Sequence, residues 1–562
     1  MHDVVIVGAG PVGLFLACEL GLAGCSVLVL EREPEPRTPW RAHPLGMRGL
    51  SAASVEAFDR RGMLPALLTA SGVREAAADA ASAADAASDS ASDSDRDSDR
   101  VAASASDSAS DSASASDSAS DAASASAAAA GDGDEPSRPR GVGHFAGIML
   151  DPARVEVAAL PFRLPGRPVE GVLTSLEAVE SVLSERAVGL GVEIRRGVAV
   201  SGLVQDDEHV VVRAGEDEHV ARWVVGCDGG RSAVRGLAGF EFVGTAPQFT
   251  GYTMLATLAD PEELRPGFTL TPTGMYLRMP AEGHIGVMDF DGGAFDRSRQ
   301  PTREHLQAVL RRVSGTDVTL TDVRLVSSFT DRAMQATSYR QGRVLLAGDA
   351  AHIHSPLGGQ GLNTGLGDAL NLGWKLAATV HGRAPDGLLD TYTRERHPVG
   401  ARVLDWTRAQ AAAMRPDPHG QAVQGLLRDL LATRDGTTYA YGRLSGSADR
   451  YDLGDEHPLV GRNAPDFRLV DGTRLGELMR DGRGVALDFR GDLFPHDSPS
   501  RWEGRLRHVP GPAKDDLGLV AVLVRPDGVV AWAGSDRAAF ERAAGSWFGR
   551  PDRPSSSTEE HA

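Results

Sequence analysis

The first thirty residues limit the possible folds more than any other part of the chain. An apolar run, Val4 to Val7, is followed by three glycines in the spacing GxGxxG and then by apolar residues at helical spacing. A second apolar run, residues 27–30, ends at Glu31, 18 residues after the last glycine. Strand, tight turn, helix and strand form a βαβ unit, and an acidic residue at this distance is typical of a ribose contact. The pattern predicts a dinucleotide-binding domain.

Each glycine of the motif (Gly8, Gly10 and Gly13) has its own task. One allows the tight turn, one lets a pyrophosphate approach the backbone, and one lets the helix pack on the strand. The helix N-terminus directs unpaired amides and a positive dipole end at the phosphates. The motif alone does not distinguish FAD from NAD.

Composition excludes several classes of protein. The 562 residues suffice for three or four domains. The sequence contains no apolar run of 18 residues and does not open on a basic segment followed by a long apolar one, so we expect neither a membrane span nor a secretion signal. Cys18, Cys25 and Cys227 lie in no CxxC or Cys/His spacing, so we expect no disulfide framework, no metal site and a reducing, cytoplasmic location. The net charge of -19 argues against a nucleic-acid partner, because phosphate binding needs clustered Lys and Arg.

Most of that charge lies in one segment. Residues 76–135 hold 14 acidic side chains against two arginines, in a repetition of Ala, Ser and Asp without any aromatic residue. Such a segment cannot bury enough apolar surface to offset its ordering entropy, so we expect a disordered insert. The alternatives are a solvated loop without chemistry, which we favour, and an acidic docking arm.

Two later segments place acidic residues after apolar strands. Asp228 and two glycines follow one strand, and Asp349 follows the apolar run 344–347. An acid at the carboxyl edge of a sheet can accept a hydrogen bond from a ribityl hydroxyl; the alternative is that Asp349 caps a helix. A predicted helix over 362–380 would direct a second positive helix end at a ligand, because it is preceded by Gly358, Gly359 and Gly361.

Together these segments resemble the motifs of class A flavoprotein monooxygenases of the p-hydroxybenzoate hydroxylase type. The Asp228 segment resembles the family's DG motif, and residues 343–376 resemble its GD motif. Within the family the chain is most similar to aromatic polyketide hydroxylases and rifampicin monooxygenases. The resemblance implies an α/β fold with a Rossmann-like FAD-binding domain, an interleaved antiparallel-sheet substrate domain and a thioredoxin-like C-terminal domain.

The resemblance also implies cofactor contacts. Asp228 would contact FAD and the pyridine nucleotide, although an Asp-Gly pair after a strand is equally typical of a simple turn. Arg41 would lie near the flavin, the alternative being a solvated loop arginine. The second helix N-terminus would face the flavin N1 and C2 carbonyl and stabilise the reduced, anionic ring. The predicted cofactor contacts are Gly8, Gly10, Pro11, Val12, Gly13, Glu31, Arg32, Arg41, Asp228, Asp349, Pro356, Gly359, Gly361, Leu362 and Asn363.

Alternating apolar and polar residues between about 239 and 331 predict an antiparallel sheet with one covered face. In the family such a sheet forms the roof over the substrate. The candidate substrate contacts on it are Tyr252, Tyr276, Arg278 and His284, and for each the alternative is a place in the core or on the sheet surface. No catalytic residue is identified by the sequence.

The predicted domain division follows these motifs. The FAD-binding domain takes residues 1–72, 171–238 and, with a helical region, 337–454; the substrate domain takes 141–170 and 239–336. A boundary before residue 455 opens the thioredoxin-like domain, 455–550, which has no cysteine and therefore no thiol redox activity. Its expected roles are packing and subunit contact, as in a homodimer.

The predicted function is an NAD(P)H-consuming, FAD-dependent monooxygenase that hydroxylates an aromatic, polyketide-like compound. The resemblance implies that reduced flavin and O2 form a C4a-hydroperoxide, and that NAD(P)H binds transiently, because only one dinucleotide motif is present. Three alternatives remain open at this point: Baeyer–Villiger or antibiotic-inactivating oxygenation on the same fold, a flavin-bound redox sensor, and an NAD-linked dehydrogenase.

Overall fold

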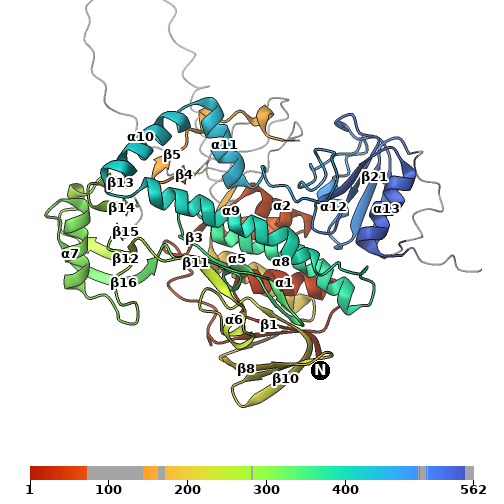
Figure 1. Cartoon of the computed structure of the whole chain (residues 1–562), viewed down its shortest axis with the longest axis horizontal. Helices are drawn as coiled ribbons and strands as arrows, with labels where there is room; N and C mark the ends of the chain where they lie inside the picture. The colour runs from red at the N-terminus through yellow and green to blue at the C-terminus, as the bar shows by residue number, and fades with distance from the viewer. Residues whose placement is uncertain are drawn as a thin grey trace, which may run out of the picture.

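The computed structural model describes residues 1–72, 143–161, 171–279, 283–491, 493, 502 and 504–550. Three sheets dominate it, and two long helices, α8 (Gln360–Val380) and α9 (Thr391–Ala413), run across its centre (Figure 1). The prediction of a disordered insert over 76–135 lies outside the described residues.

The largest sheet contains the predicted N-terminal βαβ unit. Its strand order is β18-β19-β10-β1-β2-β7, and β8 and β9 extend it through β10. The central strands are parallel and almost fully buried, as expected where helices cover both faces. Their bounds are β1 (His2–Val7), β2 (Val27–Glu31), β7 (Glu193–Arg196), β8 (Val200–Gln205), β9 (Val210–Ala214), β10 (Asp217–Gly226), β18 (Arg340–Gln341) and β19 (Val344–Leu346).

Helix α1 (Pro11–Leu22) follows β1 directly and packs against α8 and α5 (Leu176–Gly189). The predicted helix over 362–380 is confirmed as α8. It begins two residues earlier than expected, after the N-cap Gly359, whose backbone is left-handed. Smaller elements complete this part of the molecule: β3 (Met47–Leu50), which pairs with β6 (Val172–Ser175), α2 (Ala52–Arg60), α3 (Leu64–Ala70), α6 (Ala233–Leu237) and the 3-10 turn η4 (Gly348–Ala350).

The predicted antiparallel sheet with one covered face is also confirmed. Its order is β13 (Gly267–Thr271), β14 (Gly274–Arg278), β15 (His284–Asp289), β12 (Thr250–Leu258) and β16 (Leu320–Thr330). Helix α7 (Arg303–Ser314) covers the outer face (Figure 1). A three-stranded sheet of β11 (Phe242–Thr245), β17 (Ala333–Ala336) and β20 (His352–Ile353) lies at its junction with the N-terminal sheet, and β4 (His144–Phe145) with β5 (Ile148–Met149) packs near its inner face.

The sequence predicts helix to about Leu431 and then a Gly-, Ser- and Asp-rich stretch, and one helix in that stretch was not expected. The Gly-, Ser- and Asp-rich stretch after α10 (Pro418–Leu431) contains α11 (Arg434–Ser445), which Thr433 caps by accepting a hydrogen bond from the Gly436 amide. Its buried face holds Ala440 and Tyr441, which pack on the segment around Leu160. Tertiary packing outweighs the low helix propensity of Gly, Thr and Ser in this segment.

The C-terminal part is a four-stranded mixed sheet with α13 (Arg537–Phe548) against it, consistent with the expected thioredoxin-like fold. The strand order is β22 (Leu506–Pro510), β21 (Gly484–Asp488), β23 (Ala521–Val524) and β24 (Val530–Gly534), and α12 (Leu475–Leu478) lies beside it.

Buried ionic contacts join this C-terminal sheet to the helices of the N-terminal part. Arg525, in the turn after β23, is fully buried and forms two hydrogen bonds with the Glu395 carboxylate of α9, at 2.9 and 2.8 Å. Arg61 holds Glu19 of α1 in the same bidentate manner and also donates to the carbonyl of Pro526.

Candidate active site

The register of the N-terminal sheet brings the predicted motifs to one edge. Val7 lies opposite Gly226 and Leu30, and Gly226 lies opposite Leu346, so β1, β2, β10 and β19 end level with one another. The residues that follow these strands therefore converge at the carboxyl edge of parallel strands, where α/β sheets bind ligands. Gly8, Asp228 and Asp349 are among these residues, and Glu31, the last residue of β2, lies at the same edge.

The geometry of the first turn matches the three tasks expected of its glycines. Gly8 has a φ of +107°, and a Cβ on Gly13 would lie 2.0 Å from the Gly8 carbonyl oxygen, so neither position accepts a side chain. A Cβ on Gly10 would meet nothing within 4 Å in the described part of the chain. Pro11 and Val12 begin α1, whose N-cap has no side-chain hydrogen bond, so its first amides are available to an anion.

Glu31 closes the other side of this turn. Its carboxylate is buried and accepts hydrogen bonds from the backbone amides of Ala9 at 2.7 Å and Glu33 at 2.9 Å. Each carboxylate oxygen keeps a second acceptor position. Arg32 is exposed and pairs with Glu33 at 3.2 Å.

The N-terminus of α8 and the Asp349 turn also offer hydrogen-bond donors and acceptors to a ligand. Asp349 lies in η4 with its carboxylate exposed, and it accepts no hydrogen bond from the described residues, so it does not act as a helix cap. Pro356 accepts from the Gly359 amide at 3.0 Å, which forms the tight turn before Gly361 and Leu362. The N-cap Gly359 offers no side chain to the first amides of α8. An extended ligand with hydroxyl and anionic groups fits this arrangement.

Two of the predicted contacts are engaged within the protein. The Asn363 amide accepts from Ser51 N at 2.8 Å and donates to the carbonyls of Gly49 and Gly359. The Asp228 carboxylate accepts from the hydroxyl of Ser232 and the amides of Ala233 and Val234, which caps α6. Both side chains thus hold loops at the site edge.

Arg41 belongs to the loop before β3 and lies 3.3 Å from the buried carboxylate of Glu180 in α5. Burial raises the pKa of Glu180 to about 7, although Arg41 and Arg196 oppose that rise. Because ionisation of Glu180 is less favourable in the folded chain than in the unfolded one, stability is lost as the pH rises from about 4.5 through about 7.

We therefore expect Glu180→Gln to stabilise the protein above pH 7, by up to about 3 kcal/mol, and to change little below pH 5. Urea unfolding at pH 5 and pH 8 measures both values. Glu185→Gln, at an exposed position of the same helix, is the control and should show no such difference. An equal effect of Glu180→Gln at both pH values would contradict the shifted pKa.

The antiparallel sheet presents only one predicted substrate residue to its inner face. Tyr252, Tyr276 and Arg278 belong to the face that α7 covers: Tyr252 donates to or accepts from His305 of α7 at 2.8 Å, and Tyr276 packs in the same core. Arg278 donates to the Leu264 carbonyl on that side. Side chains alternate between the two faces of a strand, so these three residues lie on the α7 side and not on the face where the substrate contacts were expected.

The opposite face carries His284, which contacts Thr253 at 3.1 Å, and Met288, which packs in a cluster with Leu357 from the loop before Gly358. Burial lowers the pKa of His284, and Arg48 and His43 lower it further. Burial also lowers the pKa of Arg48, while Asp349 opposes that shift. Arg48 thus interacts electrostatically with both Asp349 and His284, while its guanidinium donates to the carbonyls of Leu45 and Met47. The sequence could have singled it out as the arginine seven residues after Arg41.

Two family models match the chain. The FAD binding domain model matches residues 1–407, and the model of the aromatic-ring hydroxylase C-terminal region matches residues 457–551. The chain belongs to the FAD-dependent aromatic-ring monooxygenases. FAD is the cofactor of these monooxygenases, and NAD(P)H is their typical co-substrate.

Relatives of this monooxygenase cover nearly its whole length. A rifampicin monooxygenase from Streptomyces venezuelae is 38% identical over 98% of this chain and 99% of its own. The solved structure of the anhydrotetracycline hydroxylase OxyS from Streptomyces rimosus has a TM-score of 0.76 at 33% identity and covers 98% of this chain and 100% of its own. That of the Diels-Alderase PyrE3 of pyrroindomycin biosynthesis has a TM-score of 0.72 at 32% identity, with the same coverage.

None of the helices described is long and apolar enough to cross a bilayer. No group of three or more His, Cys, Asp or Glu side chains in the described ranges is arranged to hold a metal ion.

Proposed function

We propose that this monooxygenase oxygenates an aromatic, polycyclic, polyketide-like compound, with NAD(P)H as the electron donor and O2 as the co-substrate. The observation that carries the proposal is the convergence of the two ligand-ready helix ends, Glu31 and Asp349 at one sheet edge. The inner face of the antiparallel sheet, which carries His284, packs through Met288 on Leu357 of the loop before α8. Relatives named for rifampicin and anhydrotetracycline support the substrate class.

The residues at the edge fit FAD. The open space at Gly10 and the first amides of α1 suit a pyrophosphate, and the second acceptor positions of Glu31 suit the adenosine ribose. The unengaged carboxylate of Asp349 suits a ribityl hydroxyl, and the first amides of α8 suit the electron-rich edge of the flavin. Asp228 and Asn363 would hold the loops that surround the cofactor. Bound FAD supplies the electron transfer and the activation of O2.

The basic groups at the inner face support an anionic substrate oxygen. Arg48 and His43 both lower the pKa of His284, so positive charge lies near it, and a phenolate oxygen beside these groups would be stabilised. The phenolate is the better nucleophile in an oxygen transfer, so His284 would orient the substrate and favour its ionised form.

We expect His284→Leu to lower kcat/KM about tenfold at pH 7, because one hydrogen-bonding group next to the substrate oxygen is lost. FAD content should be unchanged. Stopped-flow reduction and steady-state kinetics measure this loss, and His419→Leu, at an exposed position on α10, serves as the matched control. Wild-type kinetics in His284→Leu would remove His284 from the substrate site.

The deciding experiment follows NAD(P)H oxidation by the purified protein with and without a panel of polycyclic phenols, with mass spectrometry of the products. Stimulated oxidation and a gain of one oxygen support the proposal. Tandem fragmentation then separates ring hydroxylation from Baeyer–Villiger insertion or from the inactivation of an antibiotic. Conversion without a gain of oxygen and without NAD(P)H use would overturn it in favour of a non-oxidative role like that in the name of the PyrE3 relative.

Three further predictions from the sequence belong to this proposal. They are the boundaries of the domain division, assembly as a homodimer, and a cytoplasmic location. Gel filtration with light scattering tests the second of them.

A further inference from the structure

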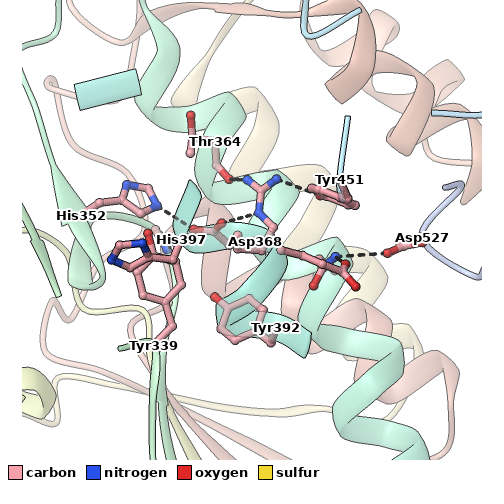
Figure 2. Close-up of polar contacts among 12 residues, drawn as sticks. Tyr339, His352, Thr364, Asp368, Tyr392, His397, Tyr451 and Asp527 are labelled. Carbon is pink, nitrogen blue, oxygen red and sulfur yellow. Dashed lines mark hydrogen bonds and ion pairs between the residues drawn. The ribbon is translucent and has the colours of Figure 1, made fainter. Parts of the chain in front are cut away.

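A fully buried carboxylate behind the site holds the turn that carries Asp349. Asp368, two helical turns into α8, accepts a hydrogen bond from the Gly348 amide at 3.0 Å. The same oxygen lies 2.7 Å from His352 Nε2. Arg396 and His352 outweigh burial and lower the pKa of Asp368, so the carboxylate is ionised and His352 Nε2 is the donor. Figure 2 shows His352 and Asp368 directed at each other. The backbone next to Asp349 is thus fixed by a side chain that does not itself reach the sheet edge.

Arg396 connects Asp368 to the N-terminal turns of α8. Its Nε donates to the second Asp368 oxygen at 2.7 Å, and its Nη2 donates to the Thr364 carbonyl at 2.9 Å (Figure 2). Thr364 belongs to the first turns of α8, next to Asn363. One ion pair therefore sets the position of the Asp349 turn relative to the beginning of α8.

The third donor of Arg396 is hydrogen-bonded to a residue that contacts the C-terminal part of the chain. Its Nη1 donates to the Tyr451 hydroxyl at 2.9 Å. The Tyr451 amide donates to the Gly461 carbonyl, and the Gly461 amide donates to the carbonyl of Val530 in β24. A continuous series of hydrogen bonds joins β24 to the Gly348 amide.

We propose that Asp368, Arg396 and Tyr451 are positioning residues through which the C-terminal domain keeps the Asp349 turn and the N-terminus of α8 at the separation that FAD requires. The guanidinium of Arg396 is planar and donates to Asp368, the Thr364 carbonyl and the Tyr451 hydroxyl at once, so it fixes these three partners relative to one another better than a flexible side chain would. The C-terminal domain, which has no cysteine, thus contributes to cofactor binding from a distance. This inference rests on the proposed contact between Asp349 and the cofactor.

The test is a double-mutant cycle between Tyr451→Phe and Asp349→Asn, read as the Kd of FAD for the full-length apoprotein by flavin fluorescence. Tyr451→Phe removes only the hydroxyl that Arg396 donates to, and we expect it to weaken FAD binding about fivefold. In the Asp349→Asn background the same change should have little effect, because the contact that it positions is already lost. Tyr439→Phe, at a tyrosine of α11 that is 60% exposed, is the matched control and should leave the Kd unchanged.

Two results overturn the inference while Asp349 keeps its role. One is an unchanged Kd in Tyr451→Phe, and the other is the same fold loss in both backgrounds, which is the additivity expected of a general loss of structure. If Asp349→Asn alone binds FAD as the wild type does, the assignment of Asp349 fails and this inference fails with it. The single variant therefore separates the two failures.

Discussion

Replacing Asp349 by alanine is expected to weaken FAD binding about 100-fold and to yield a largely colourless protein. The carboxylate is exposed at the sheet edge and accepts no hydrogen bond within the described part of the chain, so it is free to accept the ribityl hydroxyl that we propose as its partner. A hydrogen bond to a charged group contributes about 1.5–3 kcal/mol, which corresponds to about 10- to 150-fold in Kd. Titration of the apoprotein with FAD measures the loss.

Asp322→Ala is the matched control for this prediction. Asp322 is an exposed carboxylate on β16, in the antiparallel sheet and far in sequence from the FAD-binding motifs. Its removal should leave both the Kd and the yellow colour unchanged. Full FAD occupancy in Asp349→Ala would contradict the assignment of the GD turn to the ribityl chain.

Arg525→Met is expected to give the largest loss of stability, about 3–5 kcal/mol, because it removes the guanidinium that the buried carboxylates of Glu395 and Asp527 share. Arg525 is fully buried; besides its two bonds to Glu395, it donates to Asp527 at 3.0 Å. Among the described residues, Lys375 then remains as a cation partner of Glu395, at 2.9 Å. Urea unfolding followed by tryptophan fluorescence gives the free energy.

The exposed pair of Arg213 and Glu218 provides the comparison. Arg213→Met should change stability by less than about 1 kcal/mol, since solvent screens such a pair. Equal effects of the two arginine substitutions would show that the buried cluster contributes no more than a surface ion pair. If Arg525→Met does not accumulate as folded protein, Glu395→Gln, which keeps the shape of the side chain, measures the same cluster.

The parts of the site that the sequence could predict are those encoded locally. A glycine spacing between a strand and a helix determines its own geometry, which is why Gly8 and Gly13 lie as expected. The parallel order of the strands then aligns their ends, so motifs more than 300 residues apart could be expected at one edge.

The parts that could not be predicted depend on tertiary contacts. Alternation along β12 and β14 shows that two faces exist, but it does not show which face α7 covers, and this is why Tyr252 and Tyr276 lie on the other side. The partners of Asp368 come from residues 348, 352 and 396, at separations that no local pattern records. Glu395 and Arg525 are likewise 130 residues apart.

The strand order has a consequence for synthesis of the chain. Strand β1 is made first, yet its neighbour β10 ends at Gly226 and the next strand, β19, ends at Leu346. At roughly 5–20 residues per second, a ribosome needs on the order of tens of seconds to produce both. During that interval the apolar residues of β1 have only β2 beside them, so a nascent chain of this type depends on protection until its middle third emerges. Slow synthesis or truncation before Leu346 would therefore favour aggregation over folding.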